Sequence, residues 1–413
     1  MTSINTQIQD RGDMAQTRLT AVSACSLPGK GVTRLPFTEQ HRQALAFMTE
    51  WMRTAGMEVT LDAAGTLIGR RPCGGTGKTR TFILGSHQDS VRNGGRYDGI
   101  MGVVLACLAV EKAIADGWEP DFAIEVHAYA DEEGVRFPTA LLGPRALAGS
   151  VDMAVLDLAD EHGTSLREAL DAFGGDAEAV PALKREPEEI LGYLEAHIEQ
   201  GPVLENDGLP VGIVTSICGI ERNRITISGQ TGHAGTVPMQ GRRDALVAAS
   251  HIISELTARA QARDELRATF GTLTLLPGAV NQIPETVTLS LEIRSPDDAE
   301  RQAFSAMARD FAAETAAASG CTAAMRQSYA QPAQDCHSVF IDKLEEASRA
   351  HLGRSRLLPS GATHDASAMA ALCPVAMLFL RCRGGVSHVP EEYASAADMG
   401  VAISVISQFL KSL

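Results

Sequence analysis

The sequence lacks an excess of basic residues, a CxxC pair and an apolar run of roughly 18 residues, the length that crosses a membrane. Its formal net charge of -15 argues against nucleic acid or an anionic membrane as a partner, because both attract basic patches. Eight irregularly spaced cysteines are typical of reduced, mostly buried thiols. The N-terminus shows no basic start or apolar segment of a secretory signal, so we expect a cytoplasmic protein.

What the sequence does contain is ordinary for a folded globular protein. Apolar residues make up 45% of the chain and charged residues 21%, far from the composition of disordered segments. With 413 residues the chain exceeds the size at which a single core stops growing, so we expect about two or three domains. No internal repeat, low-complexity tract or heptad pattern is visible.

Helical and strand patterns alternate in the first third of the chain. The order is helix, strand, strand, helix, strand, over residues 39–56, 58–71, 81–86, 99–117 and 122–130. This alternation predicts an α/β layer with a largely parallel sheet, whose functional loops gather outside the carboxyl ends of the strands.

The pattern then changes and later returns. Residues 213–329 read as a βαββαβ-like unit with an extra leading strand, over 212–217, 222–229, 244–261, 267–276, 286–295, 298–320 and 321–330. The α/β pattern resumes with a helix, a strand and a closing helix at 338–353, 375–380 and 398–413. We therefore predict a catalytic domain formed by 1–212 and 330–413, with a second domain inserted at 213–329.

Histidines and carboxylates follow the ends of two predicted strands. The segment "GSHQDS" places His87 and Asp89 after one strand, and Asp98 follows a glycine-rich loop at the start of the next helix. Asp131, Glu132 and Glu133 follow the neighbouring strand. Taken alone, His87 could be a structural loop residue, Asp98 a helix N-cap and the acidic triplet a solvated turn.

Two further histidines complete the pattern. His197 lies in "YLEAHIEQGP", between apolar neighbours, and His388 lies in "GGVSHVPEE", after a buried strand. Together the three histidines and the carboxylates form a mixed nitrogen and oxygen set suited to zinc, manganese or cobalt. A bridging carboxylate could hold two such ions. The other histidines within helices, strands or plain loops are interpreted as structural: His41, His127, His162, His251, His337 and His351.

Nine ordered segments carry a resemblance to a known family. They are "GVTRLPFT", "GSHQDSVRNGGRYDG", "DEEGVRFP", "AHIEQGPVLE", "GHAGTVPM" with "RRDAL", "NQIP", "EIRSPD", "SGATHDA" and "GGVSHVP". The chain resembles the dinuclear-metal amidohydrolases that include allantoate amidohydrolases, N-carbamoyl-L-amino-acid hydrolases and β-ureidopropionases. The resemblance implies an α/β zinc-exopeptidase-like catalytic domain with an inserted α+β, ferredoxin-like dimerisation domain, and hence a homodimer.

The resemblance also implies a role for individual residues. The metal ligands would be His87, Asp98, Glu133, His197 and His388, and Asp98 would bridge two divalent ions per subunit. These ions would be zinc or manganese, with cobalt or nickel as the alternatives. Glu132 would be the general base, and Asp89 would orient the ring of His87. Arg294 would bind the substrate carboxylate, and His233, often across the dimer interface, would reach the scissile carbonyl. Further substrate contacts would come from Gln200, Asn281, Gly361 and His364, while Asp131 has no assigned role.

The implied reaction is hydrolysis of the ureido C–N bond of a small carboxylate, with release of ammonia and carbon dioxide. Allantoate is the expected substrate, because "GVTRLPFT" and "RFP" look more like allantoate amidohydrolases. The alternatives are an N-carbamoyl-L-amino-acid or β-ureido-acid hydrolase and, more distantly, a dipeptidase or N-acyl-amino-acid deacylase. Thr363 and Val389 depart from the usual glycine and asparagine of the family, which bears on substrate identity. The hypothesis of a non-catalytic metal-binding dimer is disfavoured, because Glu132 and all five expected ligands are present.

Overall fold

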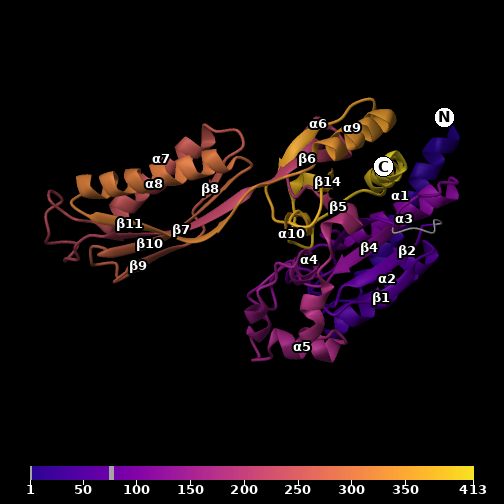
Figure 1. Cartoon of the computed structure of the whole chain (residues 1–413). Coiled ribbons are helices and arrows are strands. Elements are labelled where there is room, and N and C mark those ends of the chain that lie inside the picture. The colour runs from indigo at the N-terminus through magenta and orange to yellow at the C-terminus, as the bar shows by residue number, and fades with distance from the viewer. Residues whose placement is uncertain (1, 74–78) are drawn as a thin grey trace. The chain divides into compact units, whose positions relative to one another are not determined.

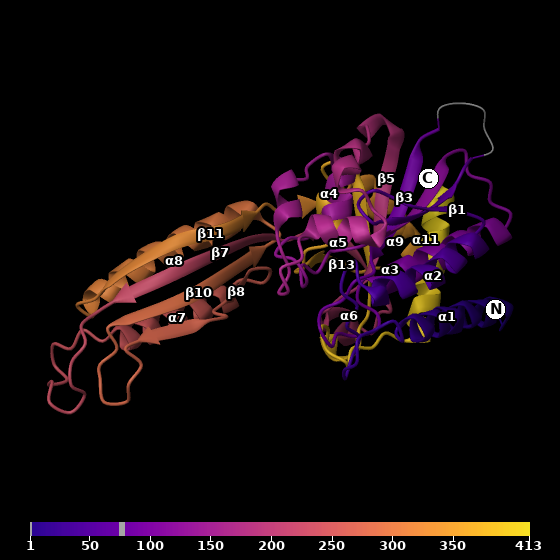
Figure 2. The same cartoon turned by 90° about the horizontal axis from the view of Figure 1, so that it is seen from below.

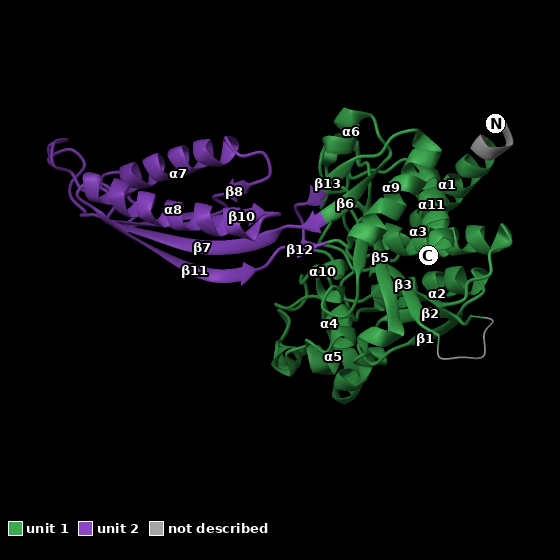
Figure 3. Ribbon diagram, turned by 45° about the horizontal axis from the view of Figure 1, so that its top comes forward, with its two compact units in different colours: residues 1–215, 336–358, 364–413 green, residues 216–335, 359–363 purple. Residues whose placement is uncertain are grey.

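The computed structural model describes residues 2–73 and 79–413, so residues 1 and 74–78 of the predicted catalytic domain lie outside the described residues. The chain divides into two compact units (Figure 3). Unit 1 contains residues 1–215, 336–358 and 364–413, and unit 2 contains 216–335 and 359–363. Along the chain, unit 2 therefore interrupts unit 1.

Unit 1 is built on one mixed sheet. Its strands are β1 (Glu58–Leu61), β2 (Leu67–Arg71), β3 (Thr81–His87), β4 (Ala123–Tyr129), β5 (Ile190–Ile198), β6 (Val211–Ile217) and β14 (Val375–Leu380). Their order in the sheet is β1-β2-β4-β3-β5-β14-β6, and β12 (Gln334–Asp335) and β13 (Leu357–Ser360) also pair with β6. The four central strands β4, β3, β5 and β14 are parallel, whereas the pairings of β1 with β2, β2 with β4 and β14 with β6 are antiparallel. The carboxyl ends of the central strands therefore share one edge, as the sequence predicted.

Helices surround this sheet (Figure 1). They are α1 (Thr2–Val22), α2 (Glu39–Thr54), α3 (Ile100–Ala115), α4 (Leu142–Ala148), α5 (Leu166–Phe173), α6 (Val203–Asp207), α9 (Ser338–Leu352), α10 (Asp365–Met369) and α11 (Ala396–Ser412). Short 3-10 turns are η1 (Met153–Asp157), η2 (Ala177–Leu183), η3 (Pro187–Glu189) and η4 (Arg383–Gly385). Helix α3 is apolar on nearly all sides because it is buried between the sheet and α1 and α11, and so forms the centre of the core.

The N-terminal helix α1 packs on the C-terminal helix α11 (Figure 2). The sequence analysis did not predict α1, because its buried face contains small residues such as Gly12 and Ala15, which carry little hydrophobic signal. The two backbones approach closely at two glycines. A Cβ at Gly12 would lie 1.8 Å from the carbonyl oxygen of Ala396, and one at Gly400 would lie 2.1 Å from that of Ile8.

Unit 2 follows the predicted βαββαβ order, except that one expected strand is divided in two. Its elements are β7 (Gly219–Ser228), α7 (Ala245–Gln261), β8 (Arg267–Thr269), β9 (Leu273–Leu276), β10 (Thr286–Ser295), α8 (Asp298–Ala318) and β11 (Thr322–Gln331). The antiparallel sheet runs β11-β7-β10-β8, and β9 also pairs with β10. Strand β10 buries alternate residues, which pack with α7 and α8 on one face of the sheet (Figure 1).

Two details of unit 2 differ from expectation. The single strand expected at 267–276 is divided into β8 and β9. The expected leading strand, β6, pairs with β14 in the sheet of unit 1, because its apolar run is long enough to be buried in that sheet. No helix among residues 2–73 and 79–413 is long and apolar enough to cross a membrane.

The close approach of α1 and α11 generates a prediction. We expect Gly400→Ala to destabilise unit 1 by roughly 1–3 kcal/mol, because the added methyl group overlaps backbone and outweighs the ~1 kcal/mol that alanine gains over glycine in a helix. Both tryptophans, Trp51 and Trp118, lie in unit 1, so their fluorescence during urea unfolding reports its stability.

Thr20→Ala, at an exposed position of α1 in the same unit, is the control for an alanine substitution that meets no neighbouring backbone. An unchanged unfolding midpoint for Gly400→Ala would show that the two helices do not pack this closely.

Candidate metal centre

The polar residues predicted from the strand ends gather at the carboxyl edge of the unit 1 sheet. His87 is the last residue of β3, and His197 is the last but one of β5. Glu132 and Glu133 follow β4, and His388 follows β14. Parallel strands therefore bring together residues from four distant parts of the sequence.

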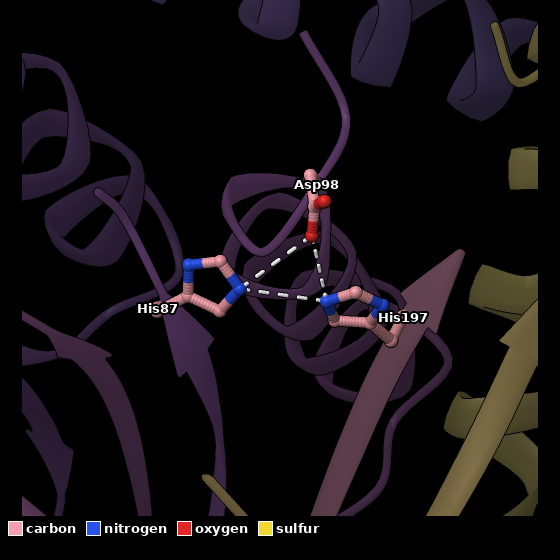
Figure 4. A group of neighbouring side chains, drawn as sticks. All are labelled: His87, Asp98 and His197. Atoms are coloured by element: carbon pink, nitrogen blue, oxygen red, sulfur yellow. Dashed lines mark hydrogen bonds and ion pairs between the residues drawn. The ribbon is translucent and has the colours of Figure 1, made fainter. Parts of the chain in front are cut away.

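One group of possible ligands consists of His87, Asp98 and His197, all buried (Figure 4). Asp98 Oδ1 lies 3.0 Å from His197 Nε2 and 3.6 Å from His87 Nε2. The two Nε2 atoms are 3.4 Å apart. Three donor atoms thus converge on one point, as ligands of a metal ion would.

A second group consists of Asp98, Glu133 and His388. Asp98 enters it through its other oxygen, Oδ2, which lies 3.2 Å from His388 Nε2. Glu133 Oε2 is 3.8 Å from the same nitrogen. The two groups therefore share one carboxylate, which faces each of them with a different oxygen.

Asp98 is not a helix cap. Helix α3 begins at Ile100 with Gly99 at the N-cap, and no side chain caps it. Gly99 has φ +65, and a Cβ there would lie 2.3 Å from the His87 ring. The glycine therefore permits His87 and Asp98 to approach each other, and the alternative interpretation of Asp98 is wrong.

The two buried histidine rings are fixed through their Nδ1 atoms. His87 Nδ1 lies 3.1 Å from the carbonyl oxygen of Asp89 and 3.3 Å from its Oδ1. His197 Nδ1 lies 2.9 Å from the carbonyl oxygen of Ile198. An Nδ1–H that donates to these oxygens leaves Nε2 without a proton, which is the form that binds a metal.

Asp89 also holds the acidic triplet. Its two carboxylate oxygens accept the backbone N–H groups of Glu132 and Glu133, at 3.2 and 3.1 Å. The side chains of the triplet then separate: Glu132 Oε2 is 3.9 Å from His87 Nε2, whereas Glu133 faces His388. Asp131 is buried, and burial raises the pKa of its carboxyl well above the usual range. The triplet is therefore not a solvated turn.

The electrostatics of this edge favour a cation. Burial, reinforced by the charge of Asp98, raises the pKa of Glu133 to about 7, and burial raises the pKa of Glu132 well above its usual range. Although burial opposes ionisation of Asp98, hydrogen bonds with His197, His388 and His87 hold its pKa well below the usual range. Glu133 Oε1 is buried and has no hydrogen-bond partner among residues 2–73 and 79–413. A divalent ion would offset the charge of these crowded carboxylates, so the donor set fits a metal.

Two residues predicted to bind substrate lie beside this centre. The ring of His364 meets that of His197 edge to face, at an interplanar angle of 63° and with centroids 4.6 Å apart. Gln200 Nε2 donates to Asp98 Oδ2 at 3.0 Å, so the amide contacts the shared carboxylate.

The other predicted substrate residues and His233 lie in unit 2 and form two pairs. The loop that carries His233 is hydrogen-bonded to the loop that carries Asn281, since the N–H of Ala234 donates to the Asn281 carbonyl at 2.9 Å. The guanidinium of Arg294 donates to Glu292 Oε1 at 2.7 Å and to the Gly361 carbonyl at 2.6 Å. The structure therefore brings His233 together with Asn281, and Arg294 together with Gly361.

Sequence reasoning missed two buried carboxylates near the centre. Glu195 accepts hydrogen bonds from the Ser86 hydroxyl at 2.8 Å and the Ala366 N–H at 2.9 Å, and it could form a third donor group with His197 and His364. Glu392 accepts the N–H of Asp98. Glu195 carried a signal, since it is a charged residue inside an apolar strand two positions before His197, whereas Glu392 lies in a polar segment and carried none.

Comparisons with known proteins agree over nearly the whole chain. The model of peptidase family M20/M25/M40 matches residues 83–412. An N-carbamoyl-L-amino acid amidohydrolase of Geobacillus stearothermophilus is 40% identical, over 92% of each chain. The allantoate amidohydrolase of Bacillus subtilis is 34% identical over 93% of each chain. A crystal structure of an amidase of the hydantoinase/carbamoylase family from Burkholderia multivorans superposes with a TM-score of 0.90 at 31% identity, covering 97% of each chain. The predicted resemblance and fold are confirmed.

The shared carboxylate predicts how metal content responds to substitution. We expect Asp98→Asn to reduce the bound metal from about two ions per chain to almost none, because both donor groups lose a charged ligand. His388→Ala should remove about one ion, since it belongs to one group only. Metal content is measured by mass spectrometry after loading and desalting.

His251→Ala, on the exposed face of α7, is the control for loss of a histidine. A folded Asp98→Asn protein that keeps both ions would contradict the bridging role.

Proposed function

The chain belongs to peptidase family M20/M25/M40, a metal-dependent family, and from this membership we propose that it hydrolyses the ureido C–N bond of a small carboxylate substrate. The observation that carries this proposal is the arrangement of two donor groups that share Asp98, with Glu132 beside them. The relatives, at up to 40% identity, are named as amidohydrolases and deiminases of N-carbamoyl-L-amino acids and allantoate.

We assign His87, Asp98, His197, Glu133 and His388 to the binding of two divalent ions. The buried Glu133 Oε1 without a partner and the oriented Nε2 atoms support this assignment. Zinc and manganese suit a mixed nitrogen and oxygen set, and cobalt or nickel would also be accepted. When bound, such ions activate water and polarise a carbonyl oxygen.

Glu132 is the proposed proton carrier. A ureido carbonyl is a poor electrophile because both flanking nitrogens donate electron density to it, so the attack of water requires help with proton transfer. The Glu132 carboxylate would accept a proton from the attacking water and deliver it to the leaving nitrogen. Burial raises the pKa of Glu132, which makes its carboxylate a better proton acceptor than an exposed one. Ammonia and carbon dioxide would be released, and the amine would remain.

Substrate recognition is assigned from the chemistry of the individual residues. The planar guanidinium of Arg294 suits a substrate carboxylate, which would take the place of its bond to Glu292 or Gly361. His233 is exposed and could donate to a developing oxyanion, and Asn281 lies in the adjoining loop. Gln200 and His364, beside the metal centre, would add polar contacts. We propose that the chain acts as a homodimer through the domain at 213–329, while its cytoplasmic location stays a prediction.

The decisive test of this function is an assay of the purified protein with a panel of possible substrates. We expect the metal-loaded protein to release ammonia from allantoate or from an N-carbamoyl-L-amino acid, and chelation to abolish the release, because the two donor groups need their ions. Ammonia is measured for allantoate, N-carbamoyl-L-amino acids, β-ureidopropionate and, as comparison, a dipeptide and an N-acetyl amino acid. Zinc, manganese, cobalt and nickel are each added to the chelated protein.

The panel also separates the alternatives. Preference for allantoate would agree with "GVTRLPFT" and "RFP", and preference for N-carbamoyl amino acids would agree with the relative of 40% identity. Cleavage of the dipeptide or N-acetyl amino acid alone would favour a peptidase or deacylase. Metal binding without any hydrolysis would indicate a non-catalytic protein.

Glu132 and Glu133 should respond differently to neutralisation. Glu132→Gln should keep its metal and lose roughly 10²–10⁴-fold in turnover, the usual contribution of a general base. Glu133→Gln should lose metal, because a ligand becomes neutral. Turnover and metal content are measured on the same preparations.

Glu58→Gln, on an exposed strand position, is the matched control. Loss of metal from Glu132→Gln would show that Glu132 is a metal ligand and would contradict the assigned division of roles between the two glutamates.

A further inference from the structure

Glu392 lies in the loop after β14 and is only 3% exposed. Its Oε1 accepts two backbone hydrogen bonds, from the N–H of Tyr97 at 3.0 Å and of Asp98 at 3.1 Å. Its Oε2 accepts the hydroxyl of Ser387, at 2.8 Å. One side chain therefore joins the loop that carries Asp98 to the loop that carries His388.

A second path links the same two loops. The hydroxyl of Ser387 lies 3.0 Å from Asp98 Oδ2 as well as 2.8 Å from Glu392 Oε2. A hydroxyl has one proton, so it donates to one of these carboxylates at a time. Ser387 therefore stands between the side chain of Asp98 and that of Glu392, while the backbone of Asp98 is bonded to Glu392 directly.

The glycine-rich loop before Asp98 is shaped around this carboxylate. A Cβ at Gly95 would lie 2.1 Å from Glu392 Oε1 and 2.5 Å from its Cβ. The loop "NGGRYDG" can therefore contact Glu392 only with glycine at position 95. This close contact holds the backbone of the loop against Glu392 at a position three residues before Asp98.

From these contacts we propose that Glu392 is a positioning residue, which fixes the shared carboxylate of Asp98 and the turn of His388 in the geometry that binds both ions. This inference rests on the proposed metal centre. Residues that hold metal ligands in place are often worth roughly 10–100-fold in metal affinity, and Glu392 holds two ligands at once.

The test compares Glu392→Ala with Glu392→Gln. The amide oxygen of glutamine can accept both backbone N–H groups, and its NH₂ group can donate to Ser387, whose proton then remains for Asp98. Affinity for zinc is measured by competition with a chromophoric chelator, and cobalt is added separately because its visible absorption reports coordination geometry. Both measurements use the full chain without substrate.

Asp62→Ala is the matched control. Asp62 Oδ1 also accepts two backbone N–H groups, from Ala64 at 2.9 Å and Thr66 at 2.8 Å, but Asp62 contacts no candidate ligand. The expected result is a loss of roughly 10–100-fold in zinc affinity and an altered cobalt spectrum for Glu392→Ala, with affinity within about threefold of the parent for Glu392→Gln and Asp62→Ala.

Three results would overturn the proposal: unchanged affinity in Glu392→Ala, an equal loss in Asp62→Ala, or no rescue by Glu392→Gln. If Glu392→Ala does not fold, Ser387→Ala removes only the hydroxyl link, and unchanged affinity and an unchanged cobalt spectrum in it would also count against the proposal. Ammonia release by the parent protein is a separate readout. If it fails while the affinities behave as expected, the proposed function is wrong and the positioning role stands.

Discussion

The carboxylate of Asp98 is the interaction on which the centre depends. Its Oδ1 faces His87 and His197, and its Oδ2 faces His388. Such sharing requires several constraints to be met together: a glycine at position 99 beside the His87 ring, parallel strands that end at one edge, and a loop held by Glu392. Each is a matter of backbone path, so the fold of unit 1 and the geometry of the donor groups are one problem.

The parts of the fold that the sequence predicted are those with a periodic or continuous apolar signal. The buried runs of β3, β4 and β14 and the alternation of β10 were recognisable for this reason. Once parallel strands are expected, the histidines and carboxylates at their ends are expected to meet. Helix α1 was not predicted because it packs through Gly12 and Ala15, which carry little hydrophobic signal. The division of one strand into β8 and β9 was not predicted because both pieces pair with β10, and this pairing has no signature in the local sequence.

At the metal centre, too, the sequence predicted what local patterns encode and missed what depends on distant residues. Strand position and residue type pointed to the three histidines, Asp98 and the acidic triplet as a whole. The choice of Glu133 from the triplet, the bridging role of Asp98 and the roles proposed for Arg294 and Asn281 came only from the family resemblance. Glu392 gave no signal, because its partner Asp98 is 294 positions away and a polar loop residue looks the same whether exposed or buried. Long-range hydrogen bonds to backbone depend on the path of the chain in space, which local patterns do not encode.

The separation between Asp98 and Glu392 also has a consequence for biosynthesis. His388 and Glu392 lie in the last tenth of a 413-residue chain, after the whole of unit 2. A nascent chain still attached to the ribosome can present His87, Asp98 and His197 long before the second donor group exists. The complete centre can therefore assemble only after His388 has been synthesised, and an ion captured earlier would find only the first donor group.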